Sequence, residues 1–144
     1  MSRVGLKRIS NSSQETVLIG RELARCIPNA QLVCLSGDLG AGKTTLTKGF
    51  VSELTGLPEE RISSPTFQYL HIYEGNQRLH HLDCYRIKDK AHFLSLGLEE
   101  YLEELSLVEW PERISPLLPK VRSEISITYL GKNKRLITYE QCSL

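Results

Sequence analysis

The chain has 144 residues, of which 40% are hydrophobic and 24% are charged, and its formal net charge is +1. This length and composition exclude an intrinsically disordered protein and predict a single domain over residues 1–144. The near-neutral charge excludes a protein that holds nucleic acid through a large excess of basic side chains. Any contact with RNA is then local or made through a partner.

The membrane and the secretory route are also disfavoured. No apolar stretch approaches the ~20 residues that a membrane-spanning helix needs. The first ten residues are partly basic but precede no apolar segment, which is unlike a secretory signal. The four cysteines form no C-x-x-C pair. We therefore expect a cytoplasmic protein with free thiols, no zinc site and no membrane contact.

The first half of the chain alternates helix and strand patterns. Ser12 and Glu15 have the spacing of a capping box, which predicts a helix that begins there and ends near Cys26. The apolar run 31–36 predicts a buried strand, and a glycine-rich turn separates it from a second predicted helix over 43–54.

The second half combines hairpins with one more helix and strand. Strand-forming residues on either side of Gly- and Asn-containing turns predict hairpins over 68–83 and 124–140. Apolar residues recur at helical spacing over 93–105, and a short apolar strand, 106–110, follows. Together these elements predict an α/β fold, with a mixed sheet flanked by helices.

Residues 37–44 match the phosphate-binding pattern G-x-x-x-x-G-K-[ST] at every fixed position, between a predicted strand and a predicted helix. Glycines let the backbone curl so that N–H groups point at phosphate oxygens, and the helix adds its positive dipole end. Lys43 would supply charge to the β- and γ-phosphates, and Thr44 a hydroxyl to Mg²⁺. The alternatives are a chance turn or a loop that no longer binds nucleotide. The predicted nucleotide-binding residues here are Gly37, Asp38, Leu39, Gly40, Ala41, Gly42, Lys43, Thr44 and Thr45.

Two carboxylates, Asp83 and Glu109, stand where predicted strands end. In open α/β sheets ligands bind beyond the carboxyl ends of strands, so both are candidates for Mg²⁺ binding and for positioning water. The alternative for each is a solvated acid in a turn. Strand alternation sends Trp110 to the face opposite Glu109, so we expect its ring to lie near the site without direct contact with nucleotide.

Further polar residues near these motifs give additional hypotheses. Thr66 lies where GTPase-like proteins have a mobile switch threonine, which makes it a third catalytic candidate, although a Pro-containing turn explains the same residues. Arg86 and Arg113 are candidate charge stabilisers or ordinary ion-pair residues. The four histidines have no metal-ligand spacing with carboxylates and receive no role.

Beyond the loop, three segments are more specific than the loop itself: 64–67 (SPTF), 81–86 (HLDCYR) and 108–112 (VEWPE). With the loop and the helix that ends in Leu18-Ile19-Gly20, they occur in order over about residues 9–140. In this order and at this chain length, the sequence resembles the TsaE (YjeE) family. These are bacterial P-loop ATPases that take part in threonylcarbamoyladenosine formation on tRNA.

The resemblance implies a parallel core sheet with antiparallel edge strands, and ATP as the nucleotide. It implies that Thr44 and Glu109 bind Mg²⁺, that Asp83 is at the nucleotide and metal site, and that Ser12 and Arg135 lie near the nucleotide. It also implies two partners. A TsaD-like protein transfers the threonylcarbamoyl group to tRNA, and a TsaB-like protein pairs with it, so tRNA contact is indirect. ATP hydrolysis would reset that complex between turnovers.

Other classes of protein fit the sequence less well. A small P-loop metabolite kinase is the main alternative, but such enzymes carry an acceptor pocket and a lid with several arginines, and no Arg-rich insertion follows the loop. A GTPase-type switch would carry N-K-x-D, whereas residues 133–136 read Asn-Lys-Arg-Leu. A binding protein with a vestigial loop disagrees with intact Lys43, Thr44, Asp83 and Glu109.

Overall fold

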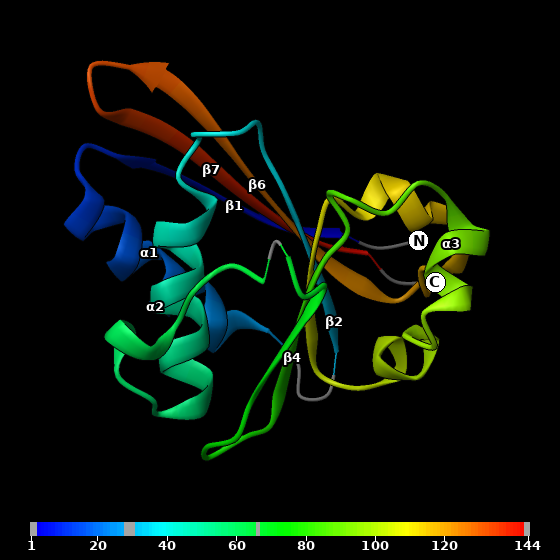
Figure 1. Ribbon diagram of the computed structural model, residues 1–144. Coiled ribbons are helices and arrows are strands. Elements are labelled where there is room, and N and C mark those ends of the chain that lie inside the picture. The colour runs from blue at the N-terminus through cyan, green and yellow to red at the C-terminus, as the bar shows by residue number, and fades with distance from the viewer. Residues whose placement is uncertain (1–2, 28–30, 66, 143–144) are drawn as a thin grey trace.

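A mixed sheet forms the centre of the fold, and its middle strand, β2 (Leu32–Ser36), leads into the glycine-rich loop (Figure 1). The structure, a computed structural model, describes residues 3–27, 31–65 and 67–142. Its elements in chain order, with η for 3₁₀ helices, are β1 (Arg3–Ser10), α1 (Ser13–Cys26), β2 (Leu32–Ser36), α2 (Lys43–Thr55), η1 (Glu59–Arg61), β3 (Leu70–Tyr73), β4 (Leu79–Asp83), α3 (Lys90–Ser95), η2 (Glu99–Glu103), β5 (Ser106–Glu109), η3 (Pro111–Leu117), β6 (Arg122–Gly131) and β7 (Lys134–Cys142).

The described residues form a seven-stranded sheet in the order β1-β7-β6-β2-β5-β4-β3. Strand β2 pairs in parallel with β5 and β6, and β5 pairs in parallel with β4. The outer pairs, β1–β7, β6–β7 and β3–β4, are antiparallel. A parallel core with antiparallel edges is therefore confirmed. Strand β1 has no counterpart in the sequence prediction.

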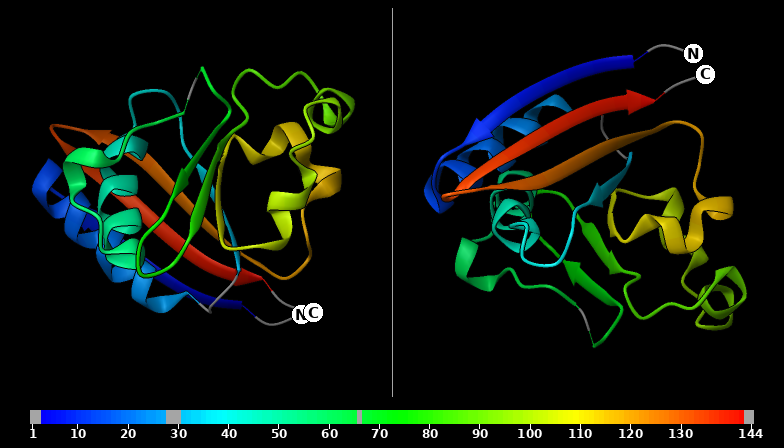
Figure 2. Two further views of the ribbon diagram at one scale, coloured as in Figure 1. Left: turned by 60° about the horizontal axis from the view of Figure 1, so that its bottom comes forward. Right: turned by 90° about the horizontal axis from the view of Figure 1, so that it is seen from above.

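Helices cover both faces of this sheet (Figures 1 and 2). Helices α1 and α2 lie on one face, while α3, η2 and η3 lie on the other. Because strand side chains alternate, β2 sends Val33 and Leu35 into the core under α1 and α2 and sends Leu32 and Cys34 into the opposite core. Among the described helices, none is both long and apolar enough to cross a membrane.

The prediction of one continuous helix over 93–105 is wrong. The structure has the short helix α3 and then η2, separated by Gly97 with φ +71°. A left-handed residue ends a helix, and glycine adopts that conformation without steric cost. The helical spacing of apolar residues persists across the break because Phe93 and Leu102 still pack into the same core.

Candidate functional site

The glycine-rich loop joins the end of β2 to the start of α2. Gly42 is the N-cap of α2 with φ +108°, a conformation that favours glycine. A Cβ at Gly37 would lie 2.7 Å from the carbonyl oxygen of Ile127 in β6, so only glycine fits there without a shift of backbone. The strand–loop–helix unit predicted from the sequence is thus present, and no side chain caps its helix.

Both predicted carboxylates lie at the same sheet edge as this loop. Asp83 ends β4 and pairs with Glu109, which ends β5, and Glu109 pairs in turn with Leu35 of β2. Both are almost fully buried, at 4% and 3% exposure. Their parallel register places three strand ends level with each other, which brings residues far apart in the chain to one site.

A cavity of about 410 Å³ opens where these strand ends meet the loop. It is lined by Leu39, Gly40, Gly42, Lys43, Thr44, Thr45, Ser64, Asp83, Tyr85, Glu109, Trp110 and Arg135. A second cavity of about 430 Å³ lies on the β6 side of the loop and is lined by residues that include Gly37, Asp38 and Ala41. Every predicted residue of the loop therefore lines one cavity or the other.

Each carboxylate is oriented by hydrogen bonds. The Oδ1 atom of Asp83 accepts from the backbone N–H of Tyr85 at 2.9 Å, and its Oδ2 atom accepts from the Ser64 hydroxyl at 3.3 Å. Glu109 bonds instead to the imidazole of His81, with 2.6 Å between Oε2 and Nε2. A carboxylate whose oxygens are held in this way presents a fixed direction to anything in the cavity.

Lys43, the basic residue of the loop, lines the same cavity as these acids and is 7% exposed. Its Nζ donates to the carbonyl oxygen of Gly37 at 2.6 Å and lies 4.0 Å from the centroid of the Trp110 ring. Burial lowers the pKa of Lys43 from its ordinary value, and the negative charges of Glu109 and Asp83 oppose that shift. The ammonium thus exchanges water for a carbonyl, an aromatic face and two nearby anions.

The expected placement of Trp110 on the face opposite Glu109 is wrong. Trp110 lies just beyond β5 in the left-handed conformation, with φ 55° and ψ 51°, so strand alternation does not apply to it. Its ring lines the same cavity as Glu109 and packs against Lys43 and Tyr85.

Arg135 reaches the loop from β7. Its Nε is buried and has no hydrogen-bond partner in the described part of the chain, while its Nη1 donates to the carbonyl of Asn133 at 3.1 Å. A Cβ at Gly42 would lie 2.9 Å from this Nε, which shows how closely the guanidinium approaches the backbone of the loop. A buried N–H without an acceptor is costly, so this atom is suited to an anion.

Other predicted residues lie elsewhere. Ser12 caps α1, where its hydroxyl accepts from the backbone N–H of Glu15, and it lines neither cavity. Thr66 lies outside the described residues. Arg86 packs against the exposed ring of Phe67, with 4.3 Å from its guanidinium carbon to the ring centroid.

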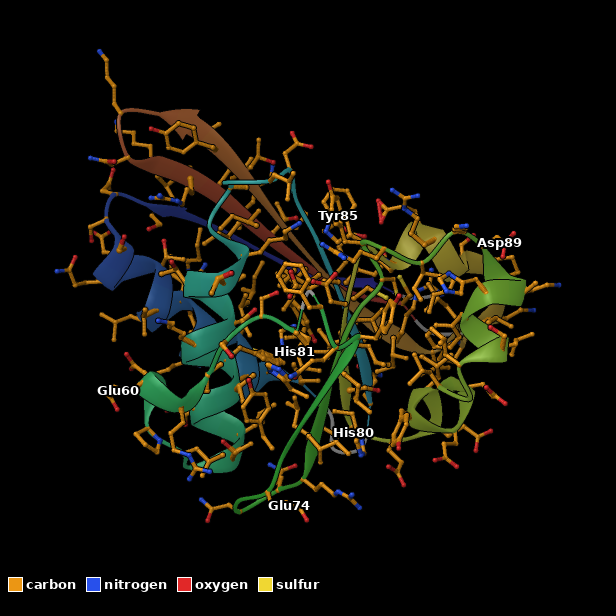
Figure 3. The ribbon with its side chains drawn as sticks, viewed as in Figure 1. Glu60, Glu74, His80, His81, Tyr85 and Asp89 are labelled. Atoms are coloured by element: carbon orange, nitrogen blue, oxygen red, sulfur yellow. The ribbon has the colours of Figure 1, made fainter. Side chains whose placement is uncertain are left out.

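The sequence reasoning missed His81. Its contact with Glu109 depends on two strands separated in the chain, and no local spacing reveals it. One signal was present: His81 stands two residues before Asp83, so strand alternation places both on the same face of β4. In Figure 3, His81 lies on the α2 side of the strand and His80 on the other side.

The fold and the loop define an α/β protein with a mixed sheet, a glycine-rich loop between β2 and α2, and acidic residues at adjacent strand ends. A family profile described as "Threonylcarbamoyl adenosine biosynthesis protein TsaE" matches residues 10–137. The chain belongs to the TsaE family.

Curated relatives and a solved structure agree with this membership. A Treponema pallidum (strain Nichols) protein is 36% identical, with 92% of this chain and 98% of that protein covered. A Bacillus subtilis (strain 168) protein is 40% identical, with 93% and 84% covered. Both are named tRNA threonylcarbamoyladenosine biosynthesis protein TsaE. The crystal structure of Bacillus subtilis YdiB is similar to this chain with a TM-score of 0.78 and 34% identity, covering 99% of this chain and 89% of YdiB.

Proposed function

We propose that the protein is a Mg²⁺-dependent ATPase that serves tRNA threonylcarbamoyladenosine biosynthesis. Its family and the names of its relatives support that process. One observation carries the proposed activity: Lys43, Asp83 and Glu109, from three separate elements, line a single cavity beside the glycine-rich loop. The comparisons lend no support to the metabolite kinase alternative.

The cavity suits the phosphates of ATP. Helix α2 begins without a side-chain cap, and the Nε of Arg135 is buried without a described acceptor, so both offer N–H groups that phosphate oxygens would satisfy. Lys43 adds a positive charge that can leave the Gly37 carbonyl for a phosphate oxygen. All of these groups are hydrogen-bond donors, so they cannot satisfy one another, and an anion would supply the acceptor that they need.

The oxygen donors of the site suit Mg²⁺, which binds hydroxyl, carboxylate, water and phosphate oxygens. The described residues hold no cluster of three or more His, Cys, Asp or Glu side chains able to bind a metal. Mg²⁺ in nucleotide sites is commonly bound through one or two carboxylates and substrate phosphates. Thr44 and Glu109 are the residues we assign to it. When bound, the ion would neutralise charge that develops on the phosphates.

Asp83 and Lys43 would carry the rest of the chemistry. The Asp83 carboxylate is oriented by Tyr85 and Ser64, so it can accept a hydrogen bond from an attacking water in a fixed direction. Lys43 would stabilise negative charge on the γ-phosphate. Arg86, a candidate charge stabiliser, packs on Phe67 and does not line the cavity, so Arg135 is the one arginine among the described lining residues. With Arg86 directed elsewhere, we expect slow hydrolysis by the chain alone.

The proposed partners are TsaD-like and TsaB-like proteins, with tRNA contacted through them. In P-loop proteins an arginine supplied by a partner raises the hydrolysis rate about 10³–10⁵-fold. Docking onto such a complex would therefore turn a slow ATPase into a fast one, which suits an accessory protein that acts once in each modification cycle.

Reconstitution tests this proposal. ATP hydrolysis is measured for the chain alone, then with the TsaD-like and TsaB-like proteins and tRNA, with and without Mg²⁺. We expect slow Mg²⁺-dependent hydrolysis that the complex accelerates, together with faster tRNA modification when the chain is added. Rapid hydrolysis that partners leave unchanged, or hydrolysis indifferent to Mg²⁺, would count against the proposal.

A pair of glutamate variants separates site chemistry from general effects. Glu109→Gln keeps the shape of the side chain, and we expect it to lower hydrolysis far more than it lowers Mg²⁺-free ADP binding. Glu100→Gln, an exposed glutamate of η2, should alter neither. Equal losses of hydrolysis in both variants would contradict the role assigned to Glu109.

A further inference from the structure

The Glu109 carboxylate has a buried partner that the proposed chemistry does not use. Its Oε2 atom lies 2.6 Å from the Nε2 of His81, and the two side chains are 4% and 0% exposed. Both residues come from β4 and β5, the adjacent parallel strands that end at the site. A hydrogen bond so well shielded from water is stronger and more directional than one at the surface.

The direction of this bond follows from the charge on Glu109, because the bond length alone fits either tautomer of His81. An ionised carboxylate only accepts hydrogen bonds, so His81 must carry a hydrogen on Nε2 to make it. The other ring nitrogen, Nδ1, is buried and has no hydrogen-bond partner among the described residues. Among the described residues, Glu109 is therefore the hydrogen-bond partner of the His81 imidazole.

The neighbouring histidine provides a contrast. His80 is equally buried but lies on the opposite face of β4, where it packs against the ring of Tyr101 and approaches Glu104 at 3.3 Å. Figure 3 shows the two histidines on opposite sides of the strand. Two adjacent residues of the same type thus differ in a single respect that bears on the site, namely contact with Glu109.

We propose that His81 is a positioning residue that holds the Glu109 carboxylate in the orientation needed to bind Mg²⁺. This inference rests on the proposed function, since it assigns Glu109 to the ion. Partners that orient metal ligands matter because a free carboxylate samples several rotamers, and loss of such a partner commonly lowers metal affinity about 10–100-fold. His81 itself does not line the cavity and reaches it only through Glu109.

The test compares two amide substitutions at position 81. In His81→Gln the side-chain amide NH₂ stands close to the place of Nε2, whereas in His81→Asn it stands closer to that of Nδ1. Both variants bury an amide in β4, so they share most of the cost to stability. The measured quantity is the magnesium effect, defined as the ratio of ADP dissociation constants without and with Mg²⁺, obtained by calorimetry.

We expect His81→Asn to reduce the magnesium effect about 10–100-fold while ADP affinity in EDTA stays unchanged. His81→Gln should retain most of the effect, and His80→Asn, the matched control, should retain all of it. Adding His81→Asn to Glu109→Gln should cause no further loss, because His81 acts through Glu109. A wild-type magnesium effect in His81→Asn would overturn the inference, and so would equal losses in the Asn and Gln variants.

Two further results separate the possible failures. Absence of a magnesium effect in the wild-type protein would overturn the proposed function and this inference together, whereas a retained effect in His81→Asn overturns this inference alone. Where His81→Asn fails to fold, nitrogen NMR of the wild-type imidazole decides. The hydrogen should reside on Nε2 of His81 in the wild type, and a neutral ring with its hydrogen on Nδ1 would refute the proposal.

Discussion

Lys43 is buried through contacts that it can exchange. Its Nζ bonds to the Gly37 carbonyl and faces the ring of Trp110, and Glu109 and Asp83 raise its affinity for the proton against the effect of burial. A phosphate oxygen offers a stronger, charged acceptor than a carbonyl. Nucleotide binding would therefore move this ammonium a short distance within the site and would not require it to leave solvent.

Lys43→Ala should abolish most nucleotide binding without unfolding the chain. The residue contributes charge to the site, and its neighbours in the loop hold their conformation through backbone bonds such as Ala41 N–H to Asp38. Bound nucleotide at 100 times its dissociation constant adds about 2.7 kcal/mol to the free energy of unfolding. The nucleotide-induced rise in melting temperature should disappear in Lys43→Ala and persist in Lys48→Ala, which alters the same helix. A full nucleotide-induced rise in the melting temperature of Lys43→Ala would contradict the role of Lys43 in nucleotide binding.

Trp110 should report nucleotide binding directly. It is the single tryptophan of the sequence, and the Lys43 ammonium lies 4.0 Å from its ring centroid. Indole emission responds to nearby charge, so movement of Lys43 toward a phosphate changes it. We expect the emission to change on addition of ADP with Mg²⁺ and to saturate at one nucleotide per chain, with a smaller change in Lys43→Ala. Unchanged emission with nucleotide that calorimetry shows to be bound would contradict this geometry.

At the scale of elements, α1 and α2 pack through glycines. A Cβ at Gly20 would lie 2.3 Å from the backbone oxygen of Leu46, and one at Gly49 would lie 2.0 Å from that of Val17. The backbones of the two helices therefore touch where these glycines stand. This contact supports the helix that begins at the glycine-rich loop.

Gly49→Ala should destabilise the protein, although alanine is the better helix former. Helix propensity alone predicts a gain of about 1 kcal/mol. The added methyl would instead force the backbones apart, and overpacking of this kind costs about 1–3 kcal/mol. Chemical denaturation measures the difference. Gly5→Ala is the control, because its Cβ would make an ordinary 3.5 Å contact with Tyr139. A more stable Gly49→Ala protein would show that the helices adjust freely.

Elements governed by local signals could be predicted from the sequence. Ser12 caps α1 as its spacing with Glu15 predicts, and the glycine-rich loop and both hairpins lie where their turn residues indicate. Strand β1 could not be predicted, because its stability comes from pairing with β7 at the other end of the sequence. The break at Gly97 was hidden because apolar spacing continues through it.

The sequence likewise predicted only part of the geometry of the candidate site. Asp83 and Glu109 follow apolar runs, so their place at strand ends was visible in the sequence. The bond between His81 and Glu109 was not, because it requires knowing that β4 and β5 are adjacent and in which register they pair. Trp110 differs for another reason. Its left-handed backbone turns the ring away from the direction that strand alternation predicts.

At the scale of the whole molecule, the cysteines differ in their access to solvent. Cys26 is exposed at the end of α1, whereas Cys34, Cys84 and Cys142 are buried. Burial raises the pKa of Cys34 and of Cys84 from an ordinary value of 9.0 to about 12. These two thiols lie in the core under α3, η2 and η3, so they report on whether that face of the sheet is closed.

Thiol reactivity and its pH dependence should follow from this arrangement. A thiol reagent at about pH 8 should modify Cys26 rapidly in the native protein, and all four cysteines of the sequence after unfolding. Cys26→Ser should remove the rapid phase.

Because the folded state keeps Cys34 and Cys84 protonated, the unfolded state alone releases those protons between pH 9.0 and about 12. Their contribution is therefore complete below that range, and stability falls as the pH rises through it. Denaturation midpoints across this range should fall less steeply in a Cys34→Ala, Cys84→Ala double variant than in the wild type. Identical slopes, or rapid modification of Cys34 or Cys84 in the native protein, would mean that the core beneath α3 is open to solvent.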